Sequence, residues 1–172
     1  MPSGLPAIEE ARSAADFAGF GEVCRAYVDW CRERYREMPW FVAEVFGYQA
    51  LDEELKMLVA KYGPPNGRTM IARIDEQIVA GGAYKTLSAD ICELKRLFVG
   101  ENARGLGLGR KLLDTLIASA KADGFAAMRL DTGHLMKEAI ALYRAAGFEP
   151  IAPYLTYPAR LMPYLIFMEK RL

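Results

Sequence analysis

The chain has 172 residues, and because Lys plus Arg and Asp plus Glu both number 22, its formal net charge is zero. A chain of this length can bury about 70% of the surface that its unfolded form exposes, so we expect one domain, residues 1–172. The balanced charge, without a basic block, argues against a nucleic-acid partner. Three cysteines without a Cys-x-x-Cys pair and a single histidine argue against a metal site and indicate reduced thiols. The chain contains no apolar run of 18 residues, which a membrane span would need. We therefore expect a soluble, cytoplasmic protein.

The first part of the chain is predicted to be mainly helical. Residues 5–8 could open a short strand, and apolar residues then keep helical spacing over 16–37, where Cys24 and Cys31 share a face and indicate packing. We expect Pro39 to end this helix. Residues 51–62 predict a second helix, with Leu55, Leu58 and Val59 on its apolar face, before the glycine- and proline-rich residues 63–67.

The next segments have the composition of strands. Residues 69–73 and 78–86 predict a hairpin across Asp75-Glu76-Gln77, and residues 91–99 a third antiparallel strand. Strand alternation would place Glu93 and Lys95 on one face of that third strand and Arg96 on the other.

The last third predicts alternating helices and strands. A helix should begin near Leu108, followed by a strand over 126–131, a helix over 137–146, and a final antiparallel pair over 148–152 and 164–169. A strand-helix-strand crossover makes 91–99 and 126–131 parallel neighbours. The predicted fold is therefore α/β (α+β), with a mixed, mostly antiparallel, twisted sheet flanked by helices on both faces.

The connection between strand 91–99 and the helix at Leu108 has the features of a phosphate-binding loop. Its sequence is Arg104-Gly105-Leu106-Gly107-Leu108-Gly109-Arg110. The first N–H groups of a helix have no internal partner and lie at its positive end, and glycines let an anion approach the backbone. Glycines and cations are unfavourable at this end of a helix, and a bound pyrophosphate would offset both.

Two motifs resemble the GNAT superfamily of N-acetyltransferases. Residues 104–109 fit its Gln/Arg-x-x-Gly-x-Gly/Ala acetyl-CoA loop, and residues 139–148, Ala-Ile-Ala-Leu-Tyr-Arg-Ala-Ala-Gly-Phe, fit its Ala-x-x-Leu-Tyr-x-x-x-Gly-Phe motif. The resemblance covers residues 69–172 well, and the earlier part only by the order of elements.

The resemblance implies roles for particular residues. It places the pantetheine arm of acetyl-CoA along Leu97, Phe98 and Val99 after a local splay of the sheet, and the pyrophosphate on the loop from Arg104 to Arg110. It makes Tyr143 the group that contacts or protonates the departing thiolate. It matches Glu93 to the strand glutamate that acts as general base in some members, directly or through water. Where the family often has asparagine, this chain has Met136, so that cofactor contact is not carried over.

Other polar and aromatic residues have weaker assignments. For Lys95 and Arg96 we expect a local charge network. His134 could bind substrate or act as a base, although its place favours a role before the last helix. The aromatic residues that could line an acceptor pocket are Trp40, Phe41, Tyr84, Tyr154 and Tyr157.

The function that these patterns favour is transfer of an acetyl group from acetyl-CoA to a primary amine of a small molecule or protein, without a metal. Whether the chain forms a homodimer is left open. The alternative from another class is a non-catalytic module that binds acyl-CoA. A second enzyme hypothesis takes Gly105-x-Gly107 as a dinucleotide-binding fingerprint, with Asp131 binding the ribose. It has less support, because position 110 is Arg rather than Gly or Ala and no run of further strand-helix units follows.

Overall fold

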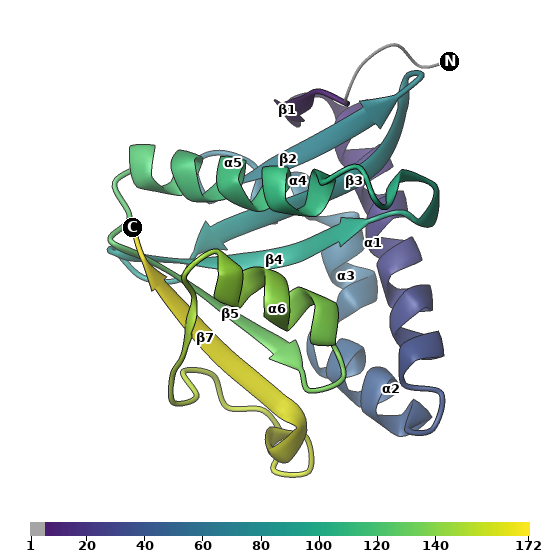
Figure 1. Ribbon diagram of the computed structural model, residues 1–172, viewed down its shortest axis with the longest axis vertical. Coiled ribbons are helices and arrows are strands. Elements are labelled where there is room, and N and C mark those ends of the chain that lie inside the picture. The colour runs from purple at the N-terminus through teal and green to yellow at the C-terminus, as the bar shows by residue number, and fades with distance from the viewer. Residues whose placement is uncertain (1–5) are drawn as a thin grey trace.

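The computed structural model describes residues 6–172, and its centre is a mixed sheet with the strand order β1-β2-β3-β4-β5-β7-β6 (Figure 1). Only the β4–β5 pair is parallel among the paired strands of this sheet. The strands are β1 (Ile8–Glu10), β2 (Gly67–Ile74), β3 (Gln77–Thr86), β4 (Ile91–Val99), β5 (Ala127–Gly133), β6 (Glu149–Pro150) and β7 (Leu165–Arg171).

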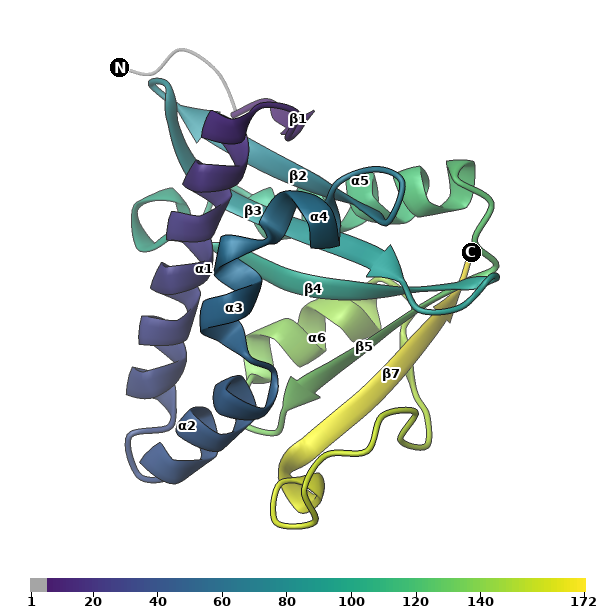
Figure 2. The same ribbon diagram turned by 180° about the vertical axis from the view of Figure 1, so that it is seen from behind.

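Helices cover both faces of the sheet, as predicted. Helices α5 and α6 lie on the face toward the viewer in Figure 1, and the helices of the N-terminal part lie on the opposite face, which Figure 2 shows from behind. The helices are α1 (Ala14–Arg34), α2 (Pro39–Tyr48), α3 (Leu51–Lys56), α4 (Leu58–Tyr62), α5 (Leu108–Ala122) and α6 (Lys137–Ala145), with 3-10 turns η1 (Glu101–Ala103) and η2 (Met162–Tyr164).

The predicted hairpin is confirmed, and its turn is shorter than expected. Ile74 pairs directly with Gln77, so only Asp75 and Glu76 connect the strands. Both have positive φ, 47° and 65°, which is the type I′ geometry whose twist matches that of the flanking strands.

The N-terminal helices differ from the prediction in two places. Pro39 begins α2 rather than ending α1, because proline lacks an N–H and fits the first helical position, where that group has no partner. The predicted helix over 51–62 is divided at Met57 into α3 and α4, and the Val59 side chain is 57% exposed rather than packed. The short N-terminal strand begins at Ile8, and Leu5 lies outside the described residues.

The C-terminal predictions are confirmed in topology. β4 and β5 are parallel across the α5 crossover, and β7 pairs antiparallel with both β5 and β6. The strand expected over 148–152 is reduced to Glu149–Pro150. The Phe148 N–H bonds to the Tyr143 carbonyl at the end of α6, and Pro150 has no N–H, although the Ile151 N–H still bonds to Phe167 of β7.

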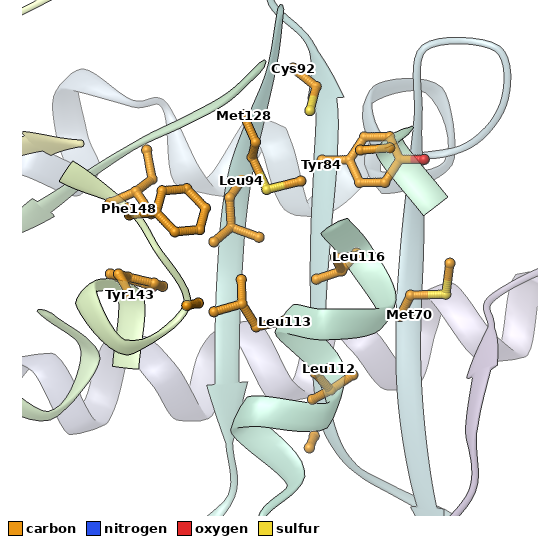
Figure 3. Close-up of a cluster of buried hydrophobic side chains, with 14 of the residues drawn as sticks. Met70, Tyr84, Cys92, Leu94, Leu112, Leu113, Leu116, Met128, Tyr143 and Phe148 are labelled. Atoms are coloured by element: carbon orange, nitrogen blue, oxygen red, sulfur yellow. The ribbon is translucent and has the colours of Figure 1, made fainter. Parts of the chain in front are cut away.

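The core beneath α5 and α6 fixes β4 in the middle of the sheet. Figure 3 shows Leu94 of β4 surrounded by Leu113 of α5, Met128 of β5 and Phe148, with Tyr143 of α6 beside them. This packing holds the end of β4 between the two helices. Within residues 6–172, no helix has the length and hydropathy that a membrane crossing requires.

Candidate active site

A β-bulge in β4 changes which side chains face the N-terminal helices. Arg96 has a φ of 57°, and the β3–β4 register shifts between Gly81 and Ala83, so two residues of β4 oppose Gly82. As a result Phe98 contacts the rings of Tyr27 and Trp30 on α1. The predicted alternation is therefore wrong beyond Lys95, because the inserted residue reverses the faces.

The two parallel strands separate just before the bulge. Ile91, Cys92 and Glu93 pair with Ala127, Met128 and Arg129, and no ladder joins the strands beyond that point. β4 nevertheless continues to Val99, and β5 continues to pair with β7 as far as Gly133, so the strands diverge as a V in both views (Figures 1 and 2). The predicted local splay is present.

A cavity of about 380 Å³, here called the donor groove, lies at the open end of the V. It brings together residues that are far apart in sequence, from α1, the end of β4, the loop before α5, and α6. Its lining is Tyr27, Trp30, Arg34, Leu97, Phe98, Val99, Arg104, Gly109, Thr132, Met136, Glu138, Ala139, Leu142 and Tyr143.

The glycines of the loop have the geometry of an anion cradle. Gly105 and Gly107 have φ values of 79° and 72°, and a side chain added at either would point into open space. Gly107 is the N-cap of α5 without a side-chain cap, and the first N–H to bond within the helix is that of Lys111, to the Gly107 carbonyl. The N–H groups that precede it are available to an anion, which fits the phosphates of acetyl-CoA.

The side chains of the loop divide between packing and the groove. Leu108 is buried and Leu106 is 39% exposed, so Leu108 anchors the start of α5. Arg104 lies 5.6 Å from the ring centres of both Trp30 and Phe98 at the groove. The Arg110 guanidinium donates to the Asp114 carboxylate at 2.9 Å, so its charge is partly compensated on the helix surface.

A small interior cavity of about 70 Å³ adjoins the donor groove. The two cavities share Tyr27, Leu97, Thr132, Met136 and Tyr143 in their linings. The hydroxyl of Tyr143, a buried residue of α6, makes no hydrogen bond with the residues that the structure describes. Burial, and secondarily the charge of Asp131, raises the pKa of Tyr143, so its hydroxyl stays protonated.

A third cavity, of about 320 Å³, opens beyond the interior cavity and is here called the acceptor vestibule. It shares Gln49, Lys95 and Arg96 with the interior cavity. Its full lining is Tyr48, Gln49, Lys61, Lys85, Leu87, Glu93, Lys95, Arg96, Leu155, Thr156 and Tyr157. The three adjoining cavities run from the loop before α5, through the splay, to the far side of the sheet.

Glu93 lines the acceptor vestibule with a side chain that is only 2% exposed. One carboxylate oxygen accepts a hydrogen bond from the Tyr154 hydroxyl at 2.7 Å, and the other lies 3.5 Å from the Lys95 ammonium and 3.9 Å from that of Lys85. Lys95 also lies 3.6 Å from Asp131, which accepts a hydrogen bond from Tyr157 at 2.7 Å. The predicted local charge network around Lys95 is confirmed.

Arg96 belongs to a second buried network that joins β4 to α3. Its guanidinium donates to Glu54 at 2.6 and 2.9 Å, and to the Gln49 side chain at 2.8 Å. Lys61 and the Tyr62 hydroxyl also donate to Glu54. Burial opposes ionisation of Glu54, but Arg96, Lys61 and Tyr62 outweigh it and lower its pKa to about 2.

Comparisons with known proteins show which family the chain resembles in sequence and in fold. The profile of the acetyltransferase (GNAT) family matches residues 22–148. The chain belongs to this family. It is 33% identical to an uncharacterized N-acetyltransferase of Schizosaccharomyces pombe over 71% of this chain and 74% of that one, and 35% identical to the uncharacterized N-acetyltransferase YjgM of Escherichia coli over 61% and 65%.

The solved structures of other acetyltransferases share the fold. The PaiA N-acetyltransferase of Thermoplasma acidophilum, solved in complex with coenzyme A, superimposes with a TM-score of 0.69 over 96% of this chain and 99% of that one, at 18% identity. The chain is thus a GNAT acetyltransferase, and its family uses acetyl-CoA.

The aromatic residues predicted to line an acceptor pocket have different positions in this GNAT fold. Phe41 lines the interior cavity and Tyr157 the vestibule, and Tyr154 bonds to Glu93. Tyr84 lies in the core beneath α5, as Figure 3 shows, and bonds to Asp123, so its assignment to the pocket is wrong. Trp40 lies outside the three cavities and packs against Arg160.

His134 precedes α6, as its sequence position favoured. The backbone N–H of His134 donates to the Tyr164 carbonyl, and the imidazole ring packs among Tyr35, Phe41 and Tyr164, outside the cavities. Sequence reasoning missed Tyr27, Gln49 and Glu54 as neighbours of the site. Nothing in the sequence singled out Glu54, because it follows two other acidic residues in α3, and only its burial against Arg96 distinguishes it.

Proposed function

We propose that this acetyltransferase transfers the acetyl group of acetyl-CoA to a primary amine by direct attack within a ternary complex. The observation that carries the proposal is the arrangement of three adjoining cavities at the splay of the sheet, with the donor groove and the acceptor vestibule each sharing lining residues with the interior cavity. Two substrates that entered the groove and the vestibule would approach one point from opposite sides, which lowers the entropic cost of the bimolecular step.

On the donor side, the loop from Arg104 to Arg110 would hold the pyrophosphate through the free N–H groups of α5. The unpaired edge of β4 at Leu97, Phe98 and Val99 would bond to the pantetheine arm as an added strand. Acetyl-CoA would supply an acyl group activated as a thioester. The remaining steps would be carried out by residues of the chain.

On the acceptor side, a primary amine is mostly ammonium at neutral pH, and the ammonium must lose one proton before its nitrogen can attack the thioester carbonyl. Glu93 would take the ammonium proton and pass it to solvent. As the N–C bond forms and the C–S bond breaks, the Tyr143 hydroxyl would protonate the departing sulfur and regain a proton from the acylated nitrogen. Glu93 lines the vestibule and not the interior cavity, whereas Tyr143 lines the interior cavity and the groove. This separation favours a water relay between the amine and Glu93.

The test is an assay of CoA release over a panel of primary amines, paired with calorimetric titration of acetyl-CoA. We expect tight binding of acetyl-CoA and amine-dependent release of CoA. Binding without turnover on any amine would instead favour a non-catalytic module that binds acyl-CoA.

A further inference from the structure

The acceptor vestibule holds more positive than negative side chains. The cations in its lining are Lys61, Lys85, Lys95 and Arg96, and the carboxylates that pair with them are Glu54, Glu93 and Asp131. They come from α3, α4, β3, β4 and β5. If all of these groups are ionised, one positive charge is left without a carboxylate of its own.

Lys61 and Arg96 share the single carboxylate of Glu54, so the surplus charge lies on that side of the vestibule. Lys85, which also lines the vestibule, is the cation with the longest ion pair. Glu54 is bonded by Lys61 at 2.8 Å and by Arg96 at 2.6 Å, and Lys95 lies between Glu93 and Asp131. Lys85 has only Glu93, at 3.9 Å, and that carboxylate is already bonded by Tyr154 and Lys95. The Lys85 side chain, 29% exposed, therefore has donors to spare in the vestibule.

The electrostatic surroundings of Lys85 would favour an anion beside it. Burial lowers its pKa, Glu93 opposes that effect, and the nearby charges of Lys61 and Lys95 lower it further. A ligand anion beside Lys85 would relieve this repulsion.

We propose that the acceptor is a free amino acid, whose carboxylate binds Lys85 while its amine points toward Glu93 and the interior cavity. This inference rests on the proposed function. Lys85 and Glu93 are directly opposite on β3 and β4, so the vestibule presents a positive and a negative group side by side. An α-amino acid carries its amine and carboxylate on one carbon, which complements that pair, and its carboxylate supplies a fourth negative charge beside the four cations of the vestibule.

The vestibule also has room for a side chain. Beyond the charged pair, its walls include Leu87, Leu155 and the ring of Tyr157, which suit an apolar or mixed side chain rather than a second anion. A peptide N-terminus would place a neutral amide beside the Lys85 ammonium instead of a carboxylate, so it would bind less tightly.

The first experiment compares each L-amino acid with its own amide in the CoA-release assay. We expect kcat/KM for the preferred amino acid to exceed that of its amide by roughly tenfold to hundredfold, which is the range for losing a hydrogen bond to a charged group. Equal values, or faster reaction of amides and peptide N-termini than of free amino acids, would overturn the inference and leave the proposed function standing.

The second experiment removes the cation. Lys85→Met should lower the acid-to-amide ratio of kcat/KM by roughly tenfold or more, mainly through KM for the acid, and Lys85→Arg should restore part of the ratio. The matched control is Lys56→Met, since Lys56 lies on α3 with a 69% exposed side chain outside the vestibule, and it should leave the ratio unchanged. A thermal shift with acetyl-CoA shows that each variant retains the fold.

If the wild-type protein binds acetyl-CoA and acetylates no amine, the proposed function fails and the inference is decided by binding alone. An amino acid should then titrate into the acetyl-CoA-saturated protein more tightly than its amide, and Lys85→Met should remove the difference. Absence of any difference in the wild-type protein would overturn it.

Discussion

At the scale of single residues, Glu93 is both deeply buried and adjacent to the acceptor vestibule. Tyr154 and Lys95 hold its carboxylate in place, so a substitution could act through catalysis or through folding. The two effects differ in what they change. Loss of a general base changes the dependence of turnover on pH, whereas loss of an ion pair changes the free energy of unfolding.

We predict that Glu93→Gln lowers turnover by about 10²–10⁴ near neutral pH, because the amide cannot accept a proton. Affinity for acetyl-CoA should barely change. The deficit should shrink as pH rises, since more of the amine is then already deprotonated. The pH–rate profiles of both proteins on one good amine measure this, and an unchanged rate with an unchanged profile would return Glu93 to a purely structural role.

Tyr143→Phe is predicted to reduce turnover more than it weakens acetyl-CoA binding, because the hydroxyl matters mainly as the thiolate departs. The hydroxyl has no partner within the described chain, so its removal should leave stability nearly unchanged. Steady-state kinetics and calorimetry separate the two effects. Tyr164→Phe is the control, since Tyr164 lies outside the three cavities, and equal rates for all three proteins would contradict the assignment.

At the scale of elements, the start of α5 lacks the features that stabilise the N-terminus of a helix. Gly107 has a left-handed backbone, no side-chain cap is present, and no acidic residue lies in the first turn. Each feature is unfavourable for an isolated helix, and each is explained by an anion at its N-terminus.

We predict that Gly107→Asp abolishes acetyl-CoA binding, because a side chain and a negative charge would occupy the pyrophosphate position. The matched control is Gly124→Asp, which adds the same side chain at a φ of 92° in open space at the other end of α5. Thermal shift with CoA measures both variants. Undiminished stabilisation of the Gly107 variant would show that the cofactor binds elsewhere.

At the scale of the whole molecule, the pair of Arg96 and Glu54 ties the N-terminal helices to the centre of the sheet. Both side chains are at most 5% exposed, and removing one partner would leave a buried charge without compensation. The folded state lowers the pKa of Glu54 from 4.5 to about 2, so ionisation stabilises the fold. This contribution is fully present above about pH 4.5 and is lost as pH falls toward 2.

Glu54→Gln should therefore lower the free energy of unfolding by about 3–5 kcal/mol at neutral pH. Between pH 5 and 3 the wild-type protein should lose stability faster than the variant, so the difference between them should narrow. Urea denaturation at several pH values measures this. Glu53→Gln, at a 71% exposed side chain on the same helix, should change stability by less than about 0.5 kcal/mol, and a parallel pH dependence of wild type and Glu54→Gln would contradict the account.

Local patterns in the sequence were enough to predict most elements and the donor side of the site. The strand over 91–99, the helix from Leu108 and the parallel crossover between them follow from periodicity and from chain connectivity, which are local properties. The loop from Arg104 to Arg110 could be proposed as a phosphate site because its glycines, its cations and the helix start are contiguous in the chain. The GNAT resemblance added the roles of Glu93 and Tyr143, which composition alone does not give.

Only the tertiary structure decided the acceptor side. The bulge at Arg96 depends on pairing with β3, and strand alternation cannot reveal an inserted residue. The vestibule is assembled from α2, α4, β3, β4 and the loop before β7, whose residues meet only after the sheet has formed. The sequence by itself thus determined the elements and the donor loop, because those depend on neighbouring residues. The charge pattern that favours an amino acid depends on distances between segments that the chain brings together by folding.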